Sequence, residues 1–537
     1  MKLTQKELKN RKIWEDAGFE LPVFDRQKMI KNTKENPEWI HFGAGNLFRA
    51  FPAAVCQDLL NKGILETGII VAEGYDYEII EKGYRNFDNL NVLVTLKADG
   101  NLDKKVIGSI AETLCVDTGN TEDWNRLTRV FKSPSLKMVS FTITEKGYSL
   151  VDTNQALLKD VASDVTGVPS AAISYMGKLV ALCYERFQNG KLPLTLVSMD
   201  NCSHNGSKLQ AAVTTFAKLW VENKSVEPEF LTYVQEDISY PWTMIDKITP
   251  RPADTVIDIL ESVGFEDAQT IVTSKNTYVA AFVNAEEPGY LVIEDNFKNG
   301  RIPLDQGGII YTDKETVDKV EKMKVCTCLN PLHTALAIYG CLLSYEKISD
   351  EMKDKELVGL IERIGYVEGL PVVEDPGIIV PNDFIDEVIQ VRLPNPFMPD
   401  TPQRIACDTS QKLSIRFGET IKAYAESPDL DVSDLTFIPL VLAGWCRYLM
   451  GIDDNGNTFE LSPDPLLSSL EPIVKNIKLG QKEGVHEIIR EILSNESIFS
   501  VDLYEIGLGE KIEALFIELI RGKGAVKDTL IKYLAYA

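Results

Sequence analysis

Between Glu38 and about Phe297, short apolar runs alternate with longer stretches in which apolar residues recur at helical spacing. Short apolar runs that are bounded by turn residues are typical of strands buried on both faces. Strands that alternate with helices in this way predict an α/β domain with a mostly parallel sheet. The expected strands are residues 39–42, 68–72, 90–95, 137–143, 193–198 and 290–293.

The pattern changes after about residue 300, where helical periodicity dominates and few strand-like runs occur. We therefore expect a boundary near Asn299-Gly300, with a Rossmann-like domain and its N-terminal extension in residues 1–299 and a mainly α-helical domain in residues 300–537. The apolar run 435–446 contains Pro439 and stops at Arg447, so it predicts a buried core helix and not a membrane span. The expected helices are 333–343, 350–364, 410–426, 434–450, 465–479, 485–493 and 510–536.

The charge balance narrows the choice of ligands. The chain has 56 basic and 80 acidic residues, which gives a net charge of −24. Such a chain repels phosphate backbones, so we expect no nucleic-acid partner, and an anionic substrate would need a local positive pocket. The nine scattered cysteines and the absence of an apolar leader predict a cytoplasmic protein with reduced thiols.

A glycine-rich turn follows the first expected strand. Gly43 permits a tight turn, and Gly45 lets backbone N–H groups at Asn46 and Leu47 approach a pyrophosphate where a helix begins. The third glycine of the dinucleotide fingerprint is replaced by Phe48. The turn thus predicts either a cofactor site or an ordinary tight turn.

Glu73 ends the second expected strand. A carboxylate at that place accepts hydrogen bonds from an adenosine ribose and repels a 2′-phosphate, which favours NAD over NADP. A solvated loop glutamate is the alternative interpretation.

Lys324, Asn330 and His333 lie close together in the second half of the chain. An amine that can lose its proton, an amide and an imidazole are the groups needed to move a proton on and off an alcohol oxygen. The alternative is that Asn330 is an N-cap before Pro331 and that His333 is a surface residue. No metal is needed, and the pair Cys326 and Cys328 has no second ligand pair at zinc-site spacing.

Several segments, in order along the chain, resemble the long-chain polyol and hexuronate dehydrogenases, the family of mannitol dehydrogenase, fructuronate (mannonate) reductase and tagaturonate reductase. The resemblance covers nearly the whole chain from about Leu21. The segments are 22–26 (PVFDR), 43–50 (GAGNLFRA), 142–148 (TITEKGY), 199–206 (MDNCSHNG), 241–250 (PWTMIDKITP), 291–297 (LVIEDNF) and 392–396 (RLPNP).

The resemblance implies a catalytic motif in which a lysine precedes the asparagine by five residues and the histidine follows it by three. Asn330 and His333 fit this motif, but Lys324 lies six residues before Asn330. Glu321 precedes Lys324 by three residues, as in the family, so the extra residue falls between Lys324 and Asn330. A local bulge in the helix would absorb it; otherwise the amine would point elsewhere, and Lys322 is the poorer substitute.

Further site residues follow from the expected strands and from the resemblance. Asn201 and Asp246 are predicted to orient substrate hydroxyls, although Asp246 is also placed to form a salt bridge with Lys247 or Arg251. Thr144 and Glu145 follow the fourth expected strand and are predicted to line the nicotinamide end of the cofactor site. Arg392 and Asn395 are predicted to hold a substrate carboxylate or a distal hydroxyl, or to be structural.

The sequence therefore predicts an NAD-dependent oxidoreductase that interconverts a keto-hexuronate and its aldonate, of the fructuronate–mannonate type, with Lys324 as general acid/base. A mannitol-type polyol 2-dehydrogenase is the nearest alternative. A catalytically inactive protein that binds NAD and a sugar acid is the second. The expected partners are a small sugar acid or polyol, with no membrane or nucleic acid, and the expected state is a monomer or homodimer.

Overall fold

The computed structural model describes residues 1–536 and consists of two compact units. Unit 1 contains Met1–Lys97 and Asn101–Asp318, and unit 2 contains Ala98–Gly100 and the chain from Lys319 onward. The sequence predicted the division near Asn299-Gly300. The structure places it later because β15 (Ile310–Thr312) pairs in parallel with β14 (Tyr290–Glu294) and so remains part of unit 1.

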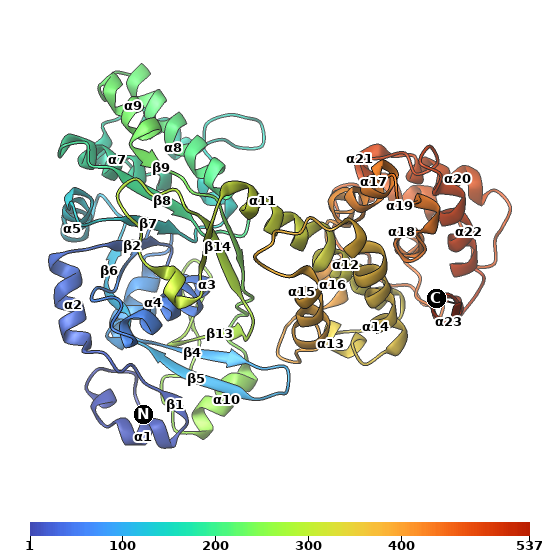
Figure 1. The fold of residues 1–537 in the computed structure, drawn as a ribbon, viewed down its shortest axis with the longest axis horizontal. Helices are drawn as coiled ribbons and strands as arrows, with labels where there is room; N and C mark the ends of the chain where they lie inside the picture. Colours follow the sequence, from blue (N-terminus) through green and yellow to red (C-terminus); the bar gives the residue numbers. More distant parts are fainter. Residues whose placement is uncertain (537) are drawn as a thin grey trace. The chain divides into compact units, whose positions relative to one another are not determined.

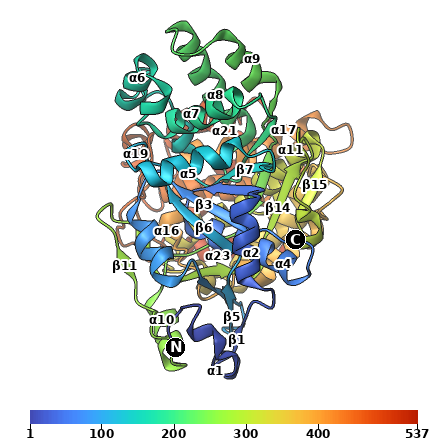
Figure 2. The same ribbon diagram turned by 90° about the vertical axis from the view of Figure 1, so that its left-hand side faces the viewer.

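In the described residues, the largest sheet of unit 1 has the strand order β6-β3-β2-β7-β8-β9, and every neighbouring pair is parallel. The chain leaves the central strand β2 through β3 to β6 on one side, and then returns to β7, β8 and β9 on the other. Figure 2 shows β3 and β6 side by side, and α5 (Thr121–Lys132) contacts β6. This is the doubly wound order in which the carboxyl end of the first strand is the topological switch point. The strands are β2 Trp39–Phe42, β3 Ile69–Glu73, β6 Ile110–Cys115, β7 Met138–Phe141, β8 Leu194–Ser198 and β9 Ile238–Ser239.

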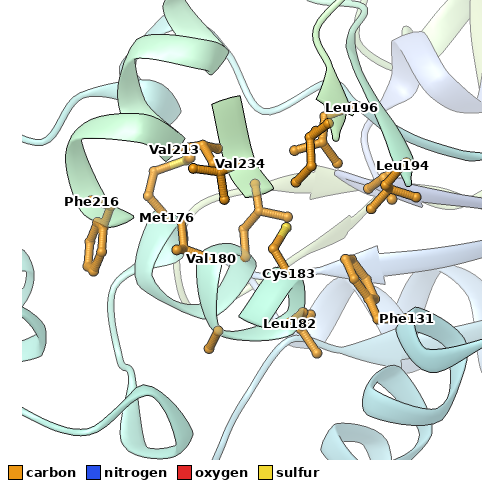
Figure 3. Close-up of a cluster of buried hydrophobic side chains, with 14 of the residues drawn as sticks. Phe131, Met176, Val180, Leu182, Cys183, Leu194, Leu196, Val213, Phe216 and Val234 are labelled. Atoms are coloured by element: carbon orange, nitrogen blue, oxygen red, sulfur yellow. The ribbon is translucent and has the colours of Figure 1, made fainter. Parts of the chain in front are cut away.

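Both faces of this sheet are buried because alternate side chains of each strand enter different cores. Ile40 and Phe42 of β2 join one core, whereas Trp39 of the same strand joins the other. On the first face, α5 packs with α7 (Tyr175–Gln188) and α8 (Asn205–Glu222). Figure 3 shows this core, where Phe131, Val180 and Leu196 converge from two helices and a strand.

Helices α7, α8 and α9 (Pro228–Glu236) lie together beyond β8 and β9 (Figure 1). The opposite face of the sheet is covered by α4 (Pro52–Asn61), whose buried residues include Cys56 and Leu59. The other α-helices of unit 1 are α1 Arg11–Asp16, α2 Arg26–Glu35, α3 Asn46–Ala50, α6 Lys159–Thr166 and α10 Asp254–Ser262. The helix α11 (Lys314–Lys322) crosses from unit 1 into unit 2.

The prediction of a parallel sheet is confirmed, but two of the expected strands belong to other sheets. The run 90–95 forms β4 (Asn91–Leu96), which makes an antiparallel hairpin with β5 (Leu102–Ile107) and pairs in parallel with β13 (Phe282–Glu286). The run 290–293 forms β14, which is antiparallel to β10 (Thr243–Asp246). Apolar strands look alike in sequence whichever sheet receives them, so the pattern predicted the strands and not their partners. The short remaining strands are β1 Phe19–Glu20, β11 Ile271–Val272 and β12 Tyr278–Val279.

Unit 2 is helical, as predicted. Its central helix α18 (Phe437–Tyr448) is buried along its whole length, which confirms the core helix expected over 435–446. It packs against α12 (Asn330–Leu342) and α22 (Gly509–Leu519), the latter two helices being far apart in sequence. The run from Lys314 to Leu342 is long and apolar enough to cross a membrane, yet 78% of its apolar window is buried inside the fold, as in a core helix. The other α-helices are α13 Ile348–Glu351, α14 Lys355–Glu362, α15 Pro381–Glu387, α16 Pro402–Ile405, α17 Glu419–Glu426, α19 Leu467–Val474, α20 Val485–Leu493, α21 Glu496–Phe499 and α23 Ala525–Tyr536.

Unit 2 also contains π-helical turns, in which hydrogen bonds span one residue more than in an α-helix. Among residues 319–536 these turns are η7 Met323–Cys328, η8 Arg363–Gly369, η10 Val388–Arg392 and η12 Ser414–Gly418. The expected uninterrupted helix 410–426 is thus divided into a 3-10 turn, a π-turn and α17. Such turns are rare and occur frequently at functional sites.

Candidate functional site

Gly43 makes the turn that follows β2. Its φ of +105° is one that L side chains rarely adopt, and an added Cβ would lie 2.2 Å from the carbonyl oxygen of Thr142. Its N–H donates to the carbonyl of Ala72, 2.9 Å away, which ties the turn to β3. A glycine is therefore required here by the fold itself, whatever the turn binds.

Gly45 differs from Gly43 in its surroundings. It is exposed, its φ is −81°, and an added Cβ would meet nothing within 4 Å. No neighbouring protein atom explains this glycine, whereas a ligand approaching the backbone would. Asn46 and Leu47, partly exposed, begin α3 beside it, and Phe48 is buried in the core at the position of the missing third glycine.

Glu73 lies at the carboxyl end of β3, as predicted, but it is buried and not a solvated loop residue. One carboxylate oxygen accepts the N–H of Ala44 at 2.9 Å, and the other accepts those of Tyr75 and Asp76 at 2.7 and 3.1 Å. The carboxylate thus clamps the glycine-rich turn to the end of the neighbouring strand. A carboxylate has about four acceptor positions, so three backbone bonds leave capacity for one more donor.

Thr144 and Asp200 form a second clamp at the same edge of the sheet. Thr144 has φ +65° and ψ 159°, which is strained for a β-branched residue. Asp200, after β8, accepts the N–H of Thr144 at 2.8 Å and that of Ile143 at 3.0 Å, and the hydroxyl of Tyr148 at 2.5 Å. Burial raises the pKa of Asp200, and these donors oppose the rise.

Asp200 is a site residue that the sequence reasoning missed. The signal was present, because Asp200 directly precedes the predicted Asn201 in the segment 199–206. Asn201 itself is exposed, and Glu145 is exposed and paired with Lys208. Asn205 is the buried amide of the segment: its Nδ2 donates to the carbonyl of Asp200 at 2.9 Å and its Oδ1 accepts the N–H of Thr243.

Asp246 ends β10 and is buried. The neighbouring cations have other contacts, since Lys247 donates to the carbonyl of Glu287 and Arg251 lies over the ring of Tyr278. Unit 1 therefore gathers the predicted residues Gly43, Glu73, Thr144 and Asn201 beyond the carboxyl ends of adjacent parallel strands, where α/β sheets bind ligands.

Lys324 is buried within η7. The N–H of Leu329 donates to the carbonyl of Lys324 at 3.1 Å, a bond that spans five residues where an α-helix spans four. The extra residue between Lys324 and Asn330, relative to the spacing that the family resemblance implies, is thereby accommodated within one turn. The bulge expected from the spacing is present.

Asn330 and His333 occupy the first turn of α12. The helix begins at Asn330, and Leu329 occupies the N-cap position. Asn330, which the sequence allows as an N-cap, is therefore the first residue of the helix. The N–H of His333 donates to the carbonyl of Leu329, and Asn330 is partly exposed. Pro331 fits this first turn because a backbone N–H at that position would have no acceptor within the helix.

His333 is mostly buried, not a surface residue. Burial, which is the largest cause, and the positive charges of Arg416, Arg404, Arg392 and Lys412 together lower its pKa to about 3. The ring is therefore neutral over the physiological range. Its Nε2 is buried without a hydrogen-bond partner among residues 1–536, and the nearest carboxylate oxygen, of Asp400, is 3.7 Å away.

Arg392 and Asn395 lie at and just after the end of η10, and both are buried. Asn395 uses its side-chain oxygen to accept the N–H of Phe397 at 3.0 Å, which shapes the turn. Arg392 is near enough to His333 for its charge to lower the pKa of the imidazole. Unit 2 thus places the charge of Arg392 near His333.

Comparison with known proteins gives a consistent assignment. Residues 37–306 match the mannitol dehydrogenase Rossmann domain, and residues 316–516 match the mannitol dehydrogenase C-terminal domain. The D-mannonate oxidoreductase of Thermotoga maritima is 52% identical over 99% of this chain and 98% of its own length. A polyol:NADP oxidoreductase of Gluconobacter oxydans is 28% identical over 83% of this chain and 86% of its own. The fold is also that of Pseudomonas fluorescens mannitol 2-dehydrogenase, solved with NAD and D-mannitol, with a TM-score of 0.70 and 24% identity over all of both chains.

Proposed function

The chain belongs to the mannitol dehydrogenase family, and we propose that it is an NAD-dependent oxidoreductase that interconverts a keto-hexuronate and its aldonate, of the fructuronate–mannonate type. The family assignment places it among enzymes that transfer hydride to and from a secondary alcohol. The 52% identity to a D-mannonate oxidoreductase over nearly the whole of both chains supports the sugar-acid substrate. The single observation that carries the chemistry is the buried Lys324, held one π-turn before the neutral His333.

Unit 1 has the residues to hold a dinucleotide. The open backbone at Gly45 suits the approach of a pyrophosphate, and Asn46 and Leu47 offer N–H groups beside it. The remaining acceptor position of Glu73 suits a ribose hydroxyl and opposes a 2′-phosphate, which favours NAD over NADP. Held by these residues, NAD would supply the acceptor for the hydride that leaves the carbinol carbon. Thr144 and Glu145 stay our candidates for the nicotinamide end.

Unit 2 supplies the groups that handle the proton. In oxidation, the neutral amine of Lys324 takes the hydroxyl proton while the C–H bond breaks; in reduction, its ammonium returns that proton. Asn330 donates an amide N–H to the oxygen as negative charge develops. The neutral His333 donates one ring N–H in the same way, and its unpartnered Nε2 suits that task. Asn201, Asp246, Arg392 and Asn395 are proposed to position the other substrate groups.

The proposal is tested by following NADH absorbance with fructuronate, tagaturonate and fructose, and by repeating the productive pair with NADPH. We expect fructuronate and NADH to give the highest kcat/KM. Preferred turnover of fructose would instead establish the mannitol-type activity. NADH binding without turnover of any of the three would identify an inactive binding protein.

The role of Lys324 is tested by replacing it with alanine. We expect kcat to fall by about 10²–10⁴-fold, the usual contribution of a general acid/base, while the Kd for NADH stays within twofold. Lys322→Ala is the matched control, because Lys322 is exposed, pairs with Glu374 at 3.1 Å and lies two residues away in the same helical run. Equal losses in both variants would contradict the assignment.

We also propose that the enzyme works in the cytoplasm on a small sugar acid, without a membrane or nucleic-acid partner, as a monomer or homodimer. The nine cysteines all lie in the described residues and none forms a disulfide, which suits a reducing compartment. Light scattering coupled to size exclusion would determine the oligomeric state, with assembly beyond a dimer as the contradicting result.

A further inference from the structure

Arg416 is attached to the helix turn that carries the proposed catalytic amide and imidazole. It lies in η12, and its Nη1 donates to the hydroxyl of Thr334. That hydroxyl in turn donates to the carbonyl of Asn330 at 2.9 Å, and Thr334 directly follows His333. The guanidinium is thus fixed beside the first turn of α12 and is not a mobile surface group.

The charge of Arg416 is not neutralised by the protein. Burial lowers its pKa to about 10, and among residues 1–536 no carboxylate lies within ion-pair distance of it. The buried Arg186, by contrast, donates to backbone carbonyls inside the fold, those of Phe131, Ser133, Leu136, Leu192 and Pro193. In the part of the chain that the structure describes, Arg416 donates to the hydroxyl of Thr334 alone. A buried guanidinium is costly unless an anion pairs with it.

The surroundings of Arg416 are positively charged. Four cations lower the pKa of the His333 ring through their charge, namely Arg416, Lys412, Arg392 and Arg404. Arg404 also forms an ion pair with Asp400. Lys412 donates to the carbonyl of Cys407, and both burial and the charge of Arg416 lower the pKa of its amine. This local concentration of positive charge occurs in a chain whose net charge is −24. It supplies the local positive charge that an anionic substrate of such a chain needs.

Arg416 is also accessible, since its side chain is partly exposed. Only an arginine offers a planar fork that binds a carboxylate through two parallel N–H bonds.

We propose that Arg416 binds the carboxylate of the substrate, with Lys412 adding positive charge beside it, so that this subsite selects sugar acids over neutral polyols. The inference rests on the proposed function, because it requires the reacting oxygen to lie at Asn330 and His333. It assigns the specificity for an acid to a residue outside the segment 392–396, where the sequence had placed it.

The test compares fructuronate with fructose, a ketose that lacks the carboxylate, in the full-length enzyme with NADH. Replacing Arg416 with methionine is expected to lower kcat/KM for fructuronate on the order of 10²-fold, mainly through KM, and to lower kcat/KM for fructose by a clearly smaller factor, because only the acid loses a contact with the guanidinium. Arg416→Lys is expected to recover part of the loss. Lys422→Met is the matched control: it also removes one positive charge, from an exposed pair with Glu419 in the following helix.

The outcomes separate the inference from the proposed function. Failure of the wild type to reduce fructuronate contradicts the proposed function itself. Wild-type turnover with an unchanged fructuronate-to-fructose ratio in Arg416→Met overturns the inference alone, as does an equal loss on both substrates. If fructose reacts too slowly, the Kd values of mannonate and mannitol supply the same ratio. If Arg416→Met does not fold, Arg416→Lys serves, with a higher KM for fructuronate alone as the supporting result.

Discussion

Leu329 donates its backbone N–H to the carbonyl of Lys324 across 3.1 Å, five residues back along the chain. A turn with this bond contains one residue more than an α-turn. The residues before and after it are therefore oriented as they would be in a regular α-helix with one residue fewer between them. Lys324 and Asn330 therefore have the relation that the family spacing of five would give on a regular helix. The register of the proposed catalytic groups survives the extra residue.

Deleting Val325, which is partly exposed in this turn, should convert it to an α-turn and leave Lys324 in place. We expect kcat to remain within about tenfold of the wild type, because the angular register is preserved. Inserting an alanine after Val325 should instead rotate Lys324 by about 100° relative to α12 and reduce kcat by at least about 10²-fold. Steady-state kinetics of the two variants, with circular dichroism to verify folding, decide the matter; the reverse order of activities would refute the interpretation.

Gly43 and Gly45 should respond differently to the same substitution. Gly43→Ala places a methyl group against the carbonyl of Thr142 at a positive φ, so we expect a loss of at least about 2 kcal/mol of stability. Gly45→Ala meets no protein atom, so the melting temperature should be unchanged while the Kd for NADH rises by about tenfold or more. Calorimetry and NADH fluorescence titration measure the two effects. Unchanged NADH affinity in Gly45→Ala would remove this turn from the cofactor site.

Asp200 should stabilise the strained backbone at Thr144. In Asp200→Asn, one of the backbone N–H groups of Ile143 and Thr144 faces the side-chain –NH2 group, which donates and cannot accept, at an expected cost of about 1–3 kcal/mol. The cost should be smaller in a Thr144→Gly background, because glycine adopts this conformation without strain. A double-mutant cycle on urea midpoints measures the coupling. Additive effects would mean that Asp200 and the strain at Thr144 are unrelated.

The neutral state of His333 has a consequence for pH dependence. Its pKa is lowered to about 3 by burial and by nearby cations, so protonation occurs only below the range in which a free imidazole titrates, near 6.5. We therefore expect that kcat/KM of the wild type shows no decrease near pH 6.5 that is attributable to His333. The pH profiles of the wild type and His333→Asn should accordingly be the same around pH 6.5. The NMR signal of the His333 ring, identified by its loss in that variant, should not shift between pH 8 and pH 5. A shift with a midpoint near 6.5 would show that the ring is charged in the working enzyme.

Glu351 should reduce the stability of unit 2 at neutral pH. Both oxygens of its buried carboxyl lack a hydrogen-bond partner among residues 1–536, and burial raises its pKa well above the ordinary value. Between the unfolded pKa of about 4.3 and the raised folded one, the folded state binds the extra proton, so stability falls as pH rises.

Glu351→Met removes the buried acid at similar volume and should stabilise the protein by about 1–3 kcal/mol at pH 8, with a smaller gain at pH 5. Glu346→Met, at an exposed site nearby, should change stability little at either pH. Thermal unfolding at the two pH values checks both variants. A destabilised Glu351→Met at pH 8 would show that the carboxyl has a partner in solution.

Much of the fold could be predicted because it depends on local pattern. The runs that became β2 and β8 are apolar and bounded by turn residues, and the all-apolar run that became α18 could only be buried. The strand β5 was missed because its sequence, LDKKVI, has three polar residues in its middle, so it shows neither an apolar run nor a strict apolar–polar alternation. Sheet partners such as that between β4 and β13 join residues far apart in the chain, and local pattern carries no signal for them.

The site was predicted unevenly for the same reason. The turn at Gly43 and the segment around His333 are short motifs, so the sequence could identify them. Arg416 lies in a run whose periodicity is that of an ordinary helix, and nothing in that run shows that the charge lacks a counter-ion. Only the three-dimensional arrangement shows which of the many cations of the chain are paired and which face His333.

The π-turn at Met323–Cys328 also affects how this chain is to be aligned with its homologues. A gap opened anywhere outside that turn would equate Lys324 with a non-equivalent side chain, even where the rest of the alignment is correct. Because the turn returns the following helix to phase, a codon can be gained or lost there during evolution without displacing the lysine. A change of one residue in the length of this turn therefore leaves the proposed relation between Lys324 and Asn330 intact.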